Sequence, residues 1–177
     1  MSLSFSIITR AAARDVPRLL EVWESSVRAT HTFLREDAIE SHIPRVRAEL
    51  ANLSPIHCLR SRSGEVYAFL GVGGQKIEML FVHADHQGFG AGRLLTEFAI
   101  KVLHADSVDV NEQNDSAVGF YHYLGFDRVG RSPHDSRGNP FTILHMALPA
   151  AHPVQAESLS KPVRTRDGSS RTALPPP

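Results

Sequence analysis

The chain has 177 residues, of which 42% are hydrophobic and 21% charged, and its 19 basic and 19 acidic side chains give a formal net charge of zero. This length suits one domain with a substantial core and is short for two, and balanced charge gives no long-range attraction for a polyanion, which disfavours a nucleic-acid-binding module. A single Cys58, no apolar stretch of the roughly 18 residues that span a membrane, and no basic segment opening a signal peptide lead us to expect a cytoplasmic protein.

The first part of the chain predicts one strand followed by two helices. Residues 5–10 are rich in β-branched side chains, which favours a strand. A helical pattern follows, with Asp15 placed to cap it and Pro17 in its permissive first turn. Its apolar face comprises Val16, Leu19, Leu20, Trp23 and Val27. A second helical pattern covers residues 39–50, and we expect Pro44 to bend it.

From residue 57 the texture changes to strands. The segments HCLRSR, VYAFLGV and KIEMLFV are separated by turns at residues 63–64 and 73–74, which predicts an antiparallel meander over residues 57–82. Residues 90–103 return to helical spacing, with Leu94, Leu95, Phe98 and Val102 on one side. A strand is expected at 107–111, a helix at 116–124, and two closing strands at 126–131 and 141–148.

This order of elements predicts an α/β fold with a mixed, mostly antiparallel central sheet and helices on both faces. We expect residues 1–149 to form one domain. Residues 150–177 are rich in Pro, Ser and Arg and lack an apolar period, so we expect a disordered tail there.

The most informative segment is the turn after the meander, where glycines stand at positions 88, 90 and 92 and a helix begins. Glycines let the backbone approach a ligand closely, and a helix start offers unpaired N–H groups and a positive dipole end to an anion such as a pyrophosphate. The spacing is neither that of the dinucleotide fingerprint nor that of the P-loop. A turn that only starts a helix remains an alternative at this point.

The ten histidines do not predict a metal site. They are scattered without the helical spacing of metal ligands, and the tightest group, His83, Asp85 and His86, has no evident fourth ligand. We therefore expect no bound metal.

Two blocks make the chain similar to a known family. Gln87-Gly88-Phe89-Gly90-Ala91-Gly92 matches the Q/R-x-x-G-x-G/A motif of the Gcn5-related N-acetyltransferase (GNAT) superfamily, and residues 111–126 resemble its N-x-x-A-x-x-x-Y-x-x-x-G-F segment. The resemblance covers residues 5–148. The amino-acid sequences of residues 29–34 and 111–126 resemble most those of a branch of small bacterial acetyltransferases. It implies a fold with splayed central strands, acetyl-CoA as co-substrate, and transfer of the acetyl group to a primary amine.

The resemblance also implies roles for individual residues. The backbone of the strand at Leu80, Phe81 and Val82 would hold the pantetheine arm. The pyrophosphate would lie on the turn formed by Gln87, Gly88, Phe89, Gly90, Ala91, Gly92 and Arg93. Asn114 would hold the pantetheine or cap the next helix, and Tyr121 would line the cofactor site and protonate the leaving thiolate. Tyr123, on a different helix face, is its competitor.

The reaction also needs a group that accepts a proton, because an amine with a pKa near 10.4 is mostly protonated at pH 7. Glu78 is the candidate, directly or through a water, since it is the only carboxylate in the splayed strand. An ordinary surface glutamate is the alternative reading. We expect direct transfer in a ternary complex, because Cys58 and its neighbour His57 point to opposite faces of a strand and cannot act together as nucleophile and base.

Two functions remain open from the sequence. The first is an acetyl-CoA-dependent N-acetyltransferase acting on a small-molecule amine or a protein amino group. The second is a non-catalytic CoA-binding sensor or partner module, which would need neither Tyr121 nor Glu78. We expect the acceptor to contact residues 23–34 and 132–140, and a monomer and a homodimer fit the sequence equally well.

Overall fold

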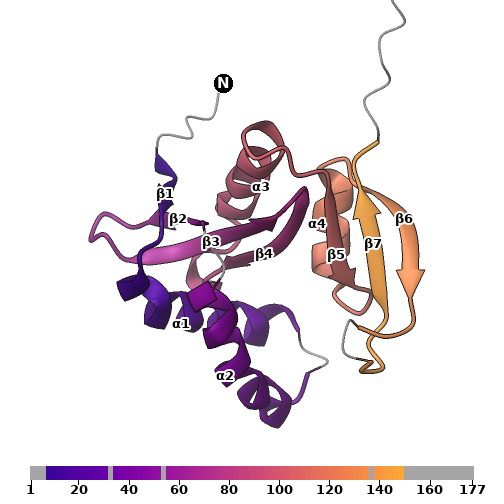
Figure 1. Cartoon of the computed structure of the whole chain (residues 1–177), viewed down its shortest axis with the longest axis horizontal. Coiled ribbons are helices and arrows are strands. Elements are labelled where there is room, and N and C mark those ends of the chain that lie inside the picture. The colour runs from indigo at the N-terminus through magenta and orange to yellow at the C-terminus, as the bar shows by residue number, and fades with distance from the viewer. Residues whose placement is uncertain (1–6, 32–33, 53–54, 136–137, 150–177) are drawn as a thin grey trace, which may run out of the picture.

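The helices and strands follow one another in the predicted order (Figure 1). The computed structural model describes residues 7–31, 34–52, 55–135 and 138–149, so the expected tail at 150–177 lies outside the described residues. The helices are α1 (Val16–Thr30), α2 (Glu36–Asn52), α3 (Ala91–Lys101) and α4 (Asp115–Tyr123). The strands are β1 (Thr9–Arg10), β2 (Ile56–Arg60), β3 (Val66–Gly73), β4 (Lys76–Val82), β5 (Ser107–Asn111), β6 (Asp127–Ser132) and β7 (Ile143–Ala147).

Two local expectations need correction. The first strand starts only at Thr9, and residues 5 and 6 of its predicted span lie outside the described part. Helix α2 includes Pro44 as expected. Val102 does not belong to the apolar face of α3, because the helix ends at Lys101 and the Val102 side chain is 47% exposed.

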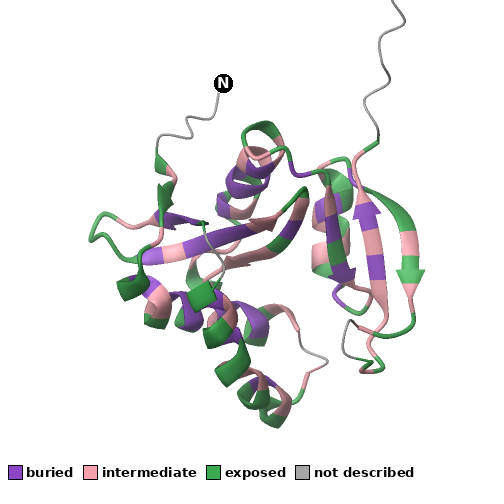
Figure 2. Cartoon of the chain, viewed as in Figure 1, coloured by how far each residue is buried: buried purple, intermediate pink, exposed green. Residues whose placement is uncertain are grey.

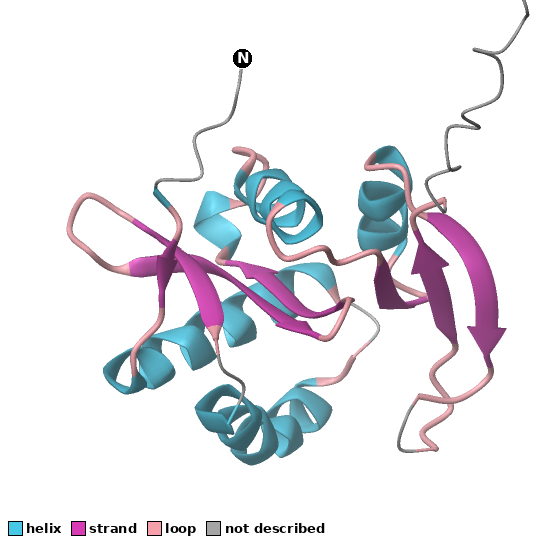
Figure 3. Ribbon diagram, turned by 45° about the horizontal axis from the view of Figure 1, so that its top comes forward, coloured by secondary structure: helices cyan, strands magenta, loops and turns pink. Residues whose placement is uncertain are grey.

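The strands form one sheet in the order β1-β2-β3-β4-β5-β7-β6, in which every pair is antiparallel except β4 with β5. Helices cover both faces, as predicted (Figure 3). On one face α1 and α2 pack on Cys58 and Phe69, and on the other α3 and α4 enclose Leu70 and Phe126. Figure 2 shows that buried residues follow β3 and recur along the helices that cover the sheet. None of the helices in the described part of the chain is both long and apolar enough to span a membrane.

The sheet opens between β4 and β5. These two strands pair only at their starts, Lys76 with Ser107 and Ile77 with Val108. Next along β4, Glu78 is an extra residue: Val72 pairs with Ile77 but Gly71 pairs with Met79, and such a bulge bends the strand that carries it. Beyond Glu78, β4 pairs with β3 alone and β5 with β7 alone, so the edges of the two strands diverge as the resemblance implied (Figure 1).

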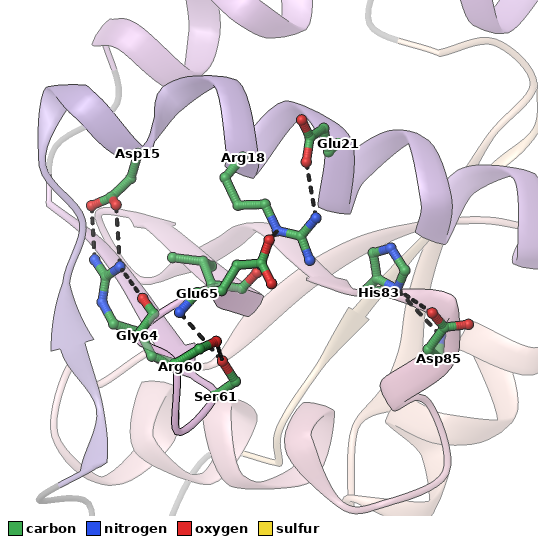
Figure 4. A network of polar contacts seen from close by, with 11 residues as sticks. Asp15, Arg18, Glu21, Arg60, Ser61, Gly64, Glu65, His83 and Asp85 are labelled. Carbon is green, nitrogen blue, oxygen red and sulfur yellow. Dashed lines mark hydrogen bonds and ion pairs between the residues drawn. The ribbon is translucent and has the colours of Figure 1, made fainter.

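An ion pair fixes the start of α1, the helix whose other end borders this opening (Figure 4). Asp15 occupies the N-cap position, but its side chain does not cap α1 as expected. Its carboxylate instead turns back to accept the Ala12 N–H at 2.7 Å and two bonds from Arg60 of β2, at 2.7 and 3.1 Å. The Arg60 guanidinium, through these hydrogen bonds, holds the pKa of Asp15 below its ordinary value of 3.8.

Asp15→Asn is therefore expected to lower the free energy of unfolding by about 1–3 kcal/mol, since it weakens charge-assisted hydrogen bonds to a buried group. Because the folded pKa is depressed, the stabilisation by the carboxylate is fully present above its unfolded value and is lost as the pH falls through the folded one. Thermal melts of both proteins should differ by a constant amount above about pH 5, begin to converge near the unfolded value of about 3.8, and be closest below the folded pKa. A gap that is independent of pH would contradict a role for the carboxylate charge.

Candidate active site

A cavity of about 310 Å³ lies in the opening of the sheet. Its walls come from β4, the glycine turn, the start of α4 and the end of α1. Of the predicted cofactor residues, eleven line it: Leu80, Phe81, Val82, Gln87, Gly88, Gly90, Ala91, Gly92, Arg93, Asn114 and Tyr121. Phe89 and Glu78 do not. The structure thus brings together residues from four separate stretches of the chain at one place.

The glycine turn aims the N-terminus of α3 at this cavity. Gly88 and Gly90 have φ values of 81° and 87°, a left-handed conformation that favours glycine. The chain then enters α3 at Ala91, and the first N–H groups of a helix have no partner within it. A Cβ on Gly92 would lie 3.4 Å from Phe120 Cζ and 3.8 Å from Val82 Cγ2, two residues of the cavity wall. The arrangement suits an anion held by backbone donors.

The three other side chains of the turn have distinct surroundings. Gln87 ties the turn to the end of β4, because its Nε2 donates to the Val82 carbonyl at 3.1 Å. Arg93 donates to Glu97 at 2.7 Å and is about half exposed. Phe89 lies outside the cavity with 85% of its side chain exposed. Of these three residues, Gln87 and Arg93 line the cavity and Phe89 does not.

Tyr121 forms the opposite wall. It is only 6% exposed and packs edge-on against Phe120 and Phe126, with ring centroids 5.1 and 5.5 Å away. Burial raises the pKa of the Tyr121 hydroxyl, so the group keeps its proton at neutral pH and is a hydrogen-bond donor. Tyr123 is 74% exposed and lies outside the cavity, in agreement with its different helix face.

Asn114 caps the helix that carries Tyr121. Its Oδ1 accepts the Ala117 N–H at 3.0 Å, which satisfies one of the unpaired donors at the start of α4. The side chain is buried and also lines the cavity. The capping role expected for Asn114 is therefore present.

A second cavity, of about 230 Å³, adjoins the first between α1, α2 and β4. The two share His31 and Phe81. The walls are largely apolar, from Trp23, Val27, Leu34, Ile39 and Val46, and two carboxylates, Glu49 and Glu78, face it. Glu78 thus lies beside the first cavity rather than in it; its side chain is 42% exposed, and Lys76 Nζ is 3.6 Å away.

A third cavity, of about 370 Å³, lies on the open face of β5, β7 and β6 and shares Glu78 with the second. Its floor is a row of hydrogen bonds in the order Ser–His–Asp. His145 Nδ1 is 2.6 Å from Asp109 Oδ1, and Ser132 Oγ is 2.7 Å from His145 Nε2. A carboxylate only accepts, so Nδ1 carries the proton and Nε2 accepts the Ser132 hydroxyl. Sequence reasoning missed this row because it depends on the register of β5 on β7, which places Asp109 opposite His145.

Of the remaining candidate side chains, Cys58 and His57 lie apart from these cavities, whereas His86 lines the first one. Cys58 is buried under α1 and α2, while the ring of His57 packs on Phe98 of α3 at 5.0 Å, so the pair faces opposite sides of the sheet as expected. His86 stacks on Tyr67 with ring centroids 4.5 Å apart. Among the described residues, no three His, Cys, Asp or Glu side chains come together in a way that could hold a metal ion.

The combination of an open β4–β5 edge and a helix N-terminus aimed into the opening is that of an acyl-CoA-dependent acetyltransferase. The family model described as "Acetyltransferase (GNAT) domain" matches residues 61–148, which include the glycine turn and Tyr121. A curated acetyltransferase is 33% identical to this chain over 151 residues, which is 81% of this chain and 97% of that protein. The chain therefore belongs to the GNAT family and is an acetyl-CoA-dependent N-acetyltransferase.

The similar proteins include bacterial acetyltransferases. Peptidyl-lysine N-acetyltransferase YjaB of Escherichia coli (strain K12) is 33% identical over 151 residues, which cover 81% of this chain and 97% of the relative. The solution structure of apo-form YjaB from Escherichia coli has a TM-score of 0.72 at 34% identity and covers 79% of this chain and 95% of that one. The structure of yncA from Salmonella typhimurium with acetyl-CoA has a TM-score of 0.55 at 21% identity, covering 80% and 91%, and agrees in fold.

Proposed function

We propose that this enzyme acetylates the side-chain amino group of a protein lysine by direct attack on acetyl-CoA in a ternary complex. The observation that carries the proposal is the meeting of two cavities of different character at His31 and Phe81. One has a helix N-terminus suited to a pyrophosphate. The other is an apolar passage with carboxylates. The naming of YjaB as a peptidyl-lysine N-acetyltransferase supports the same acceptor class.

The cofactor would lie along the open edge of β4. The pyrophosphate of acetyl-CoA would be held by N–H groups of the turn from Gly88 to Arg93, and the pantetheine arm would run beside Leu80, Phe81 and Val82 like an added strand. A backbone N–H of this segment would polarise the thioester carbonyl. Only the strand backbone is needed for this, because β5 has already diverged at this level.

The second cavity suits a lysine side chain. Its walls from α1 and α2 would pack on the aliphatic stem, and among its described lining residues Glu49 and Glu78 are acidic while none is Lys or Arg. An ammonium group is therefore attracted to this passage. The third cavity continues the groove along β5, β7 and β6, where Ser132, held by the Asp109–His145 row, would contact the chain that flanks the lysine.

The chemistry needs one proton donor and one acceptor. Tyr121 would give its proton to the departing thiolate, because the residue lines the cofactor cavity and its hydroxyl stays protonated at neutral pH. Glu78 would draw the ammonium in and accept a proton through a water, since it lines the second cavity and not the first. No acyl-enzyme is required, and Cys58 is too deeply buried to form one.

Release of the CoA thiol with a panel of acceptors tests the proposal. Lysine peptides with a free side-chain amine should release thiol from acetyl-CoA, and the same peptides with the amine already acetylated should not. Acetyl-CoA at about 100 times its dissociation constant should add roughly 2.7 kcal/mol of stability and raise the melting temperature. The proposal would be overturned if saturating acetyl-CoA left the melting temperature unchanged and no amine released thiol.

A further inference from the structure

His31 occupies a position that the proposed chemistry has not yet used. It is the C-cap residue of α1, and its backbone N–H donates to the Val27 carbonyl at 2.8 Å. Its side chain lines both the cofactor cavity and the acceptor cavity. Phe81 is the other described residue that lines both, and it cannot exchange a proton. An imidazole therefore stands at the junction where the amine would meet the thioester.

The neighbours of His31 fix which ring nitrogen carries the proton. The Thr30 hydroxyl donates to the Ser26 carbonyl at 2.9 Å, so its oxygen is left to accept. His31 Nδ1 is 2.9 Å from that oxygen and must therefore be the protonated nitrogen. This leaves Nε2 as the nitrogen that accepts hydrogen bonds and protons.

Asn114 shows where this Nε2 lies. Because Asn114 Oδ1 accepts the Ala117 N–H, its Nδ2 is the atom turned toward His31, and the Nδ2 to Nε2 distance is 3.5 Å. The contact is at the long limit of a hydrogen bond. Nε2 thus faces the Asn114 amide at the start of α4, the helix that carries Tyr121.

We propose that His31 Nε2 is the catalytic base that takes the proton from the acceptor amine. The inference rests on the proposed function and moves the proton acceptor from Glu78 to His31: the carboxylate of Glu78 draws the ammonium into the passage, and the imidazole at the junction takes the proton in its place. Burial lowers the pKa of His31 from its ordinary value of 6.5, so the ring is neutral and able to accept at neutral pH.

The proton balance closes with the chain's own groups. The ammonium of the acceptor loses one proton to His31 Nε2, which passes it to solvent through the acceptor cavity. The neutral amine attacks the thioester carbonyl, the C–N bond forms, and the C–S bond breaks as Tyr121 protonates the thiolate. The second nitrogen proton leaves by the same route through His31, and the Tyr121 oxygen takes up a proton from solvent. One ammonium and one acetyl-CoA yield one amide, one CoA thiol and one proton released.

Steady-state kinetics of His31→Gln test the inference with a lysine peptide that the wild type acetylates. We expect kcat to fall about 100-fold or more, as for the loss of a general base, with acetyl-CoA affinity unchanged. The fall of wild-type kcat at acidic pH should be centred below 6.5, where His31 becomes protonated, and should be absent in the variant. Titratable groups that face the same two cavities are His42, Glu49, Glu78, His86, Arg93 and Tyr121.

Three comparisons make the outcome decisive. His122→Gln removes an exposed imidazole from α4, outside both cavities, and should keep wild-type kcat and pH dependence. His31→Ala should regain part of its activity on addition of free imidazole, which separates a chemical role from a structural one. Glu78→Gln should raise KM for the peptide more than it lowers kcat.

Unchanged kcat in His31→Gln, or loss of the acidic limb in Glu78→Gln alone, would overturn the assignment of His31 while leaving the acetyltransferase function standing. A wild type that releases no thiol with any amine would overturn the function itself. A His31→Gln protein that melts like the wild type and still binds acetyl-CoA, yet fails to turn over, is the result that we expect.

Discussion

Tyr121→Phe is expected to lower kcat about 100-fold or more, because the change removes the hydroxyl that protonates the departing thiolate. The ring remains, so its edge-on contacts with Phe120 and Phe126 and the packing of α4 should survive. Acetyl-CoA affinity should change little, since the backbone of β4 and of the glycine turn would hold the cofactor. Steady-state kinetics with a lysine peptide and a thermal melt with acetyl-CoA measure the two effects separately.

Tyr123→Phe is the matched control, because it removes the same hydroxyl two residues away from a side chain that is 74% exposed and outside the cavity. It should retain wild-type kcat. If Tyr123→Phe were slow and Tyr121→Phe fast, the acid would be assigned to the wrong residue. If neither change had an effect, single-turnover measurement of acetyl transfer would show whether product release hides the chemical step.

Gly92→Glu is expected to abolish the stabilisation by acetyl-CoA, which is roughly 2.7 kcal/mol at 100 times the dissociation constant. A Cβ at this position faces Phe120 and Val82, so the longer side chain would enter the cavity and place a negative charge where the pyrophosphate binds. The fold should survive, because glutamate is a better helix former than glycine and its charge is favourable in the first turn of α3. The measurement is the melting temperature with and without saturating acetyl-CoA.

Two variants separate the charge from other effects. Gly92→Ala adds only a Cβ at ordinary contact distance from Phe120 and should keep most of the response to acetyl-CoA. Gly119→Glu adds the same charged side chain to α4, where nothing lies within 4 Å of the new Cβ, and should respond like the wild type. A Gly92→Glu protein whose melting temperature still rises with acetyl-CoA would contradict the placement of the pyrophosphate at the start of α3.

The order of the elements could be predicted because each helix and strand is indicated by residues close together in the sequence. The period of the apolar residues distinguishes α1 from β3, and a glycine pair ends the strand before β4. Errors arose where tertiary contacts override local preference. Asp15 is a residue type that commonly caps helices. Its carboxylate instead accepts a hydrogen bond from Arg60, 45 positions away in the sequence, and makes no capping bond to α1.

The sequence alone determined that the glycine turn, Asn114 and Tyr121 are candidate residues of the cofactor site. Each belongs to a short motif, and such a motif is recognised from residues that are close together in the sequence. The tertiary structure decided which groups meet. The bulge at Glu78 opens the sheet, and only then does His31, at the end of α1, come within 3.5 Å of Asn114, 83 positions away in the sequence. The row from Asp109 to Ser132 likewise exists only in one register of three strands. Such meetings depend on strand pairing and helix packing over long sequence separations, and no local pattern of residue types specifies them.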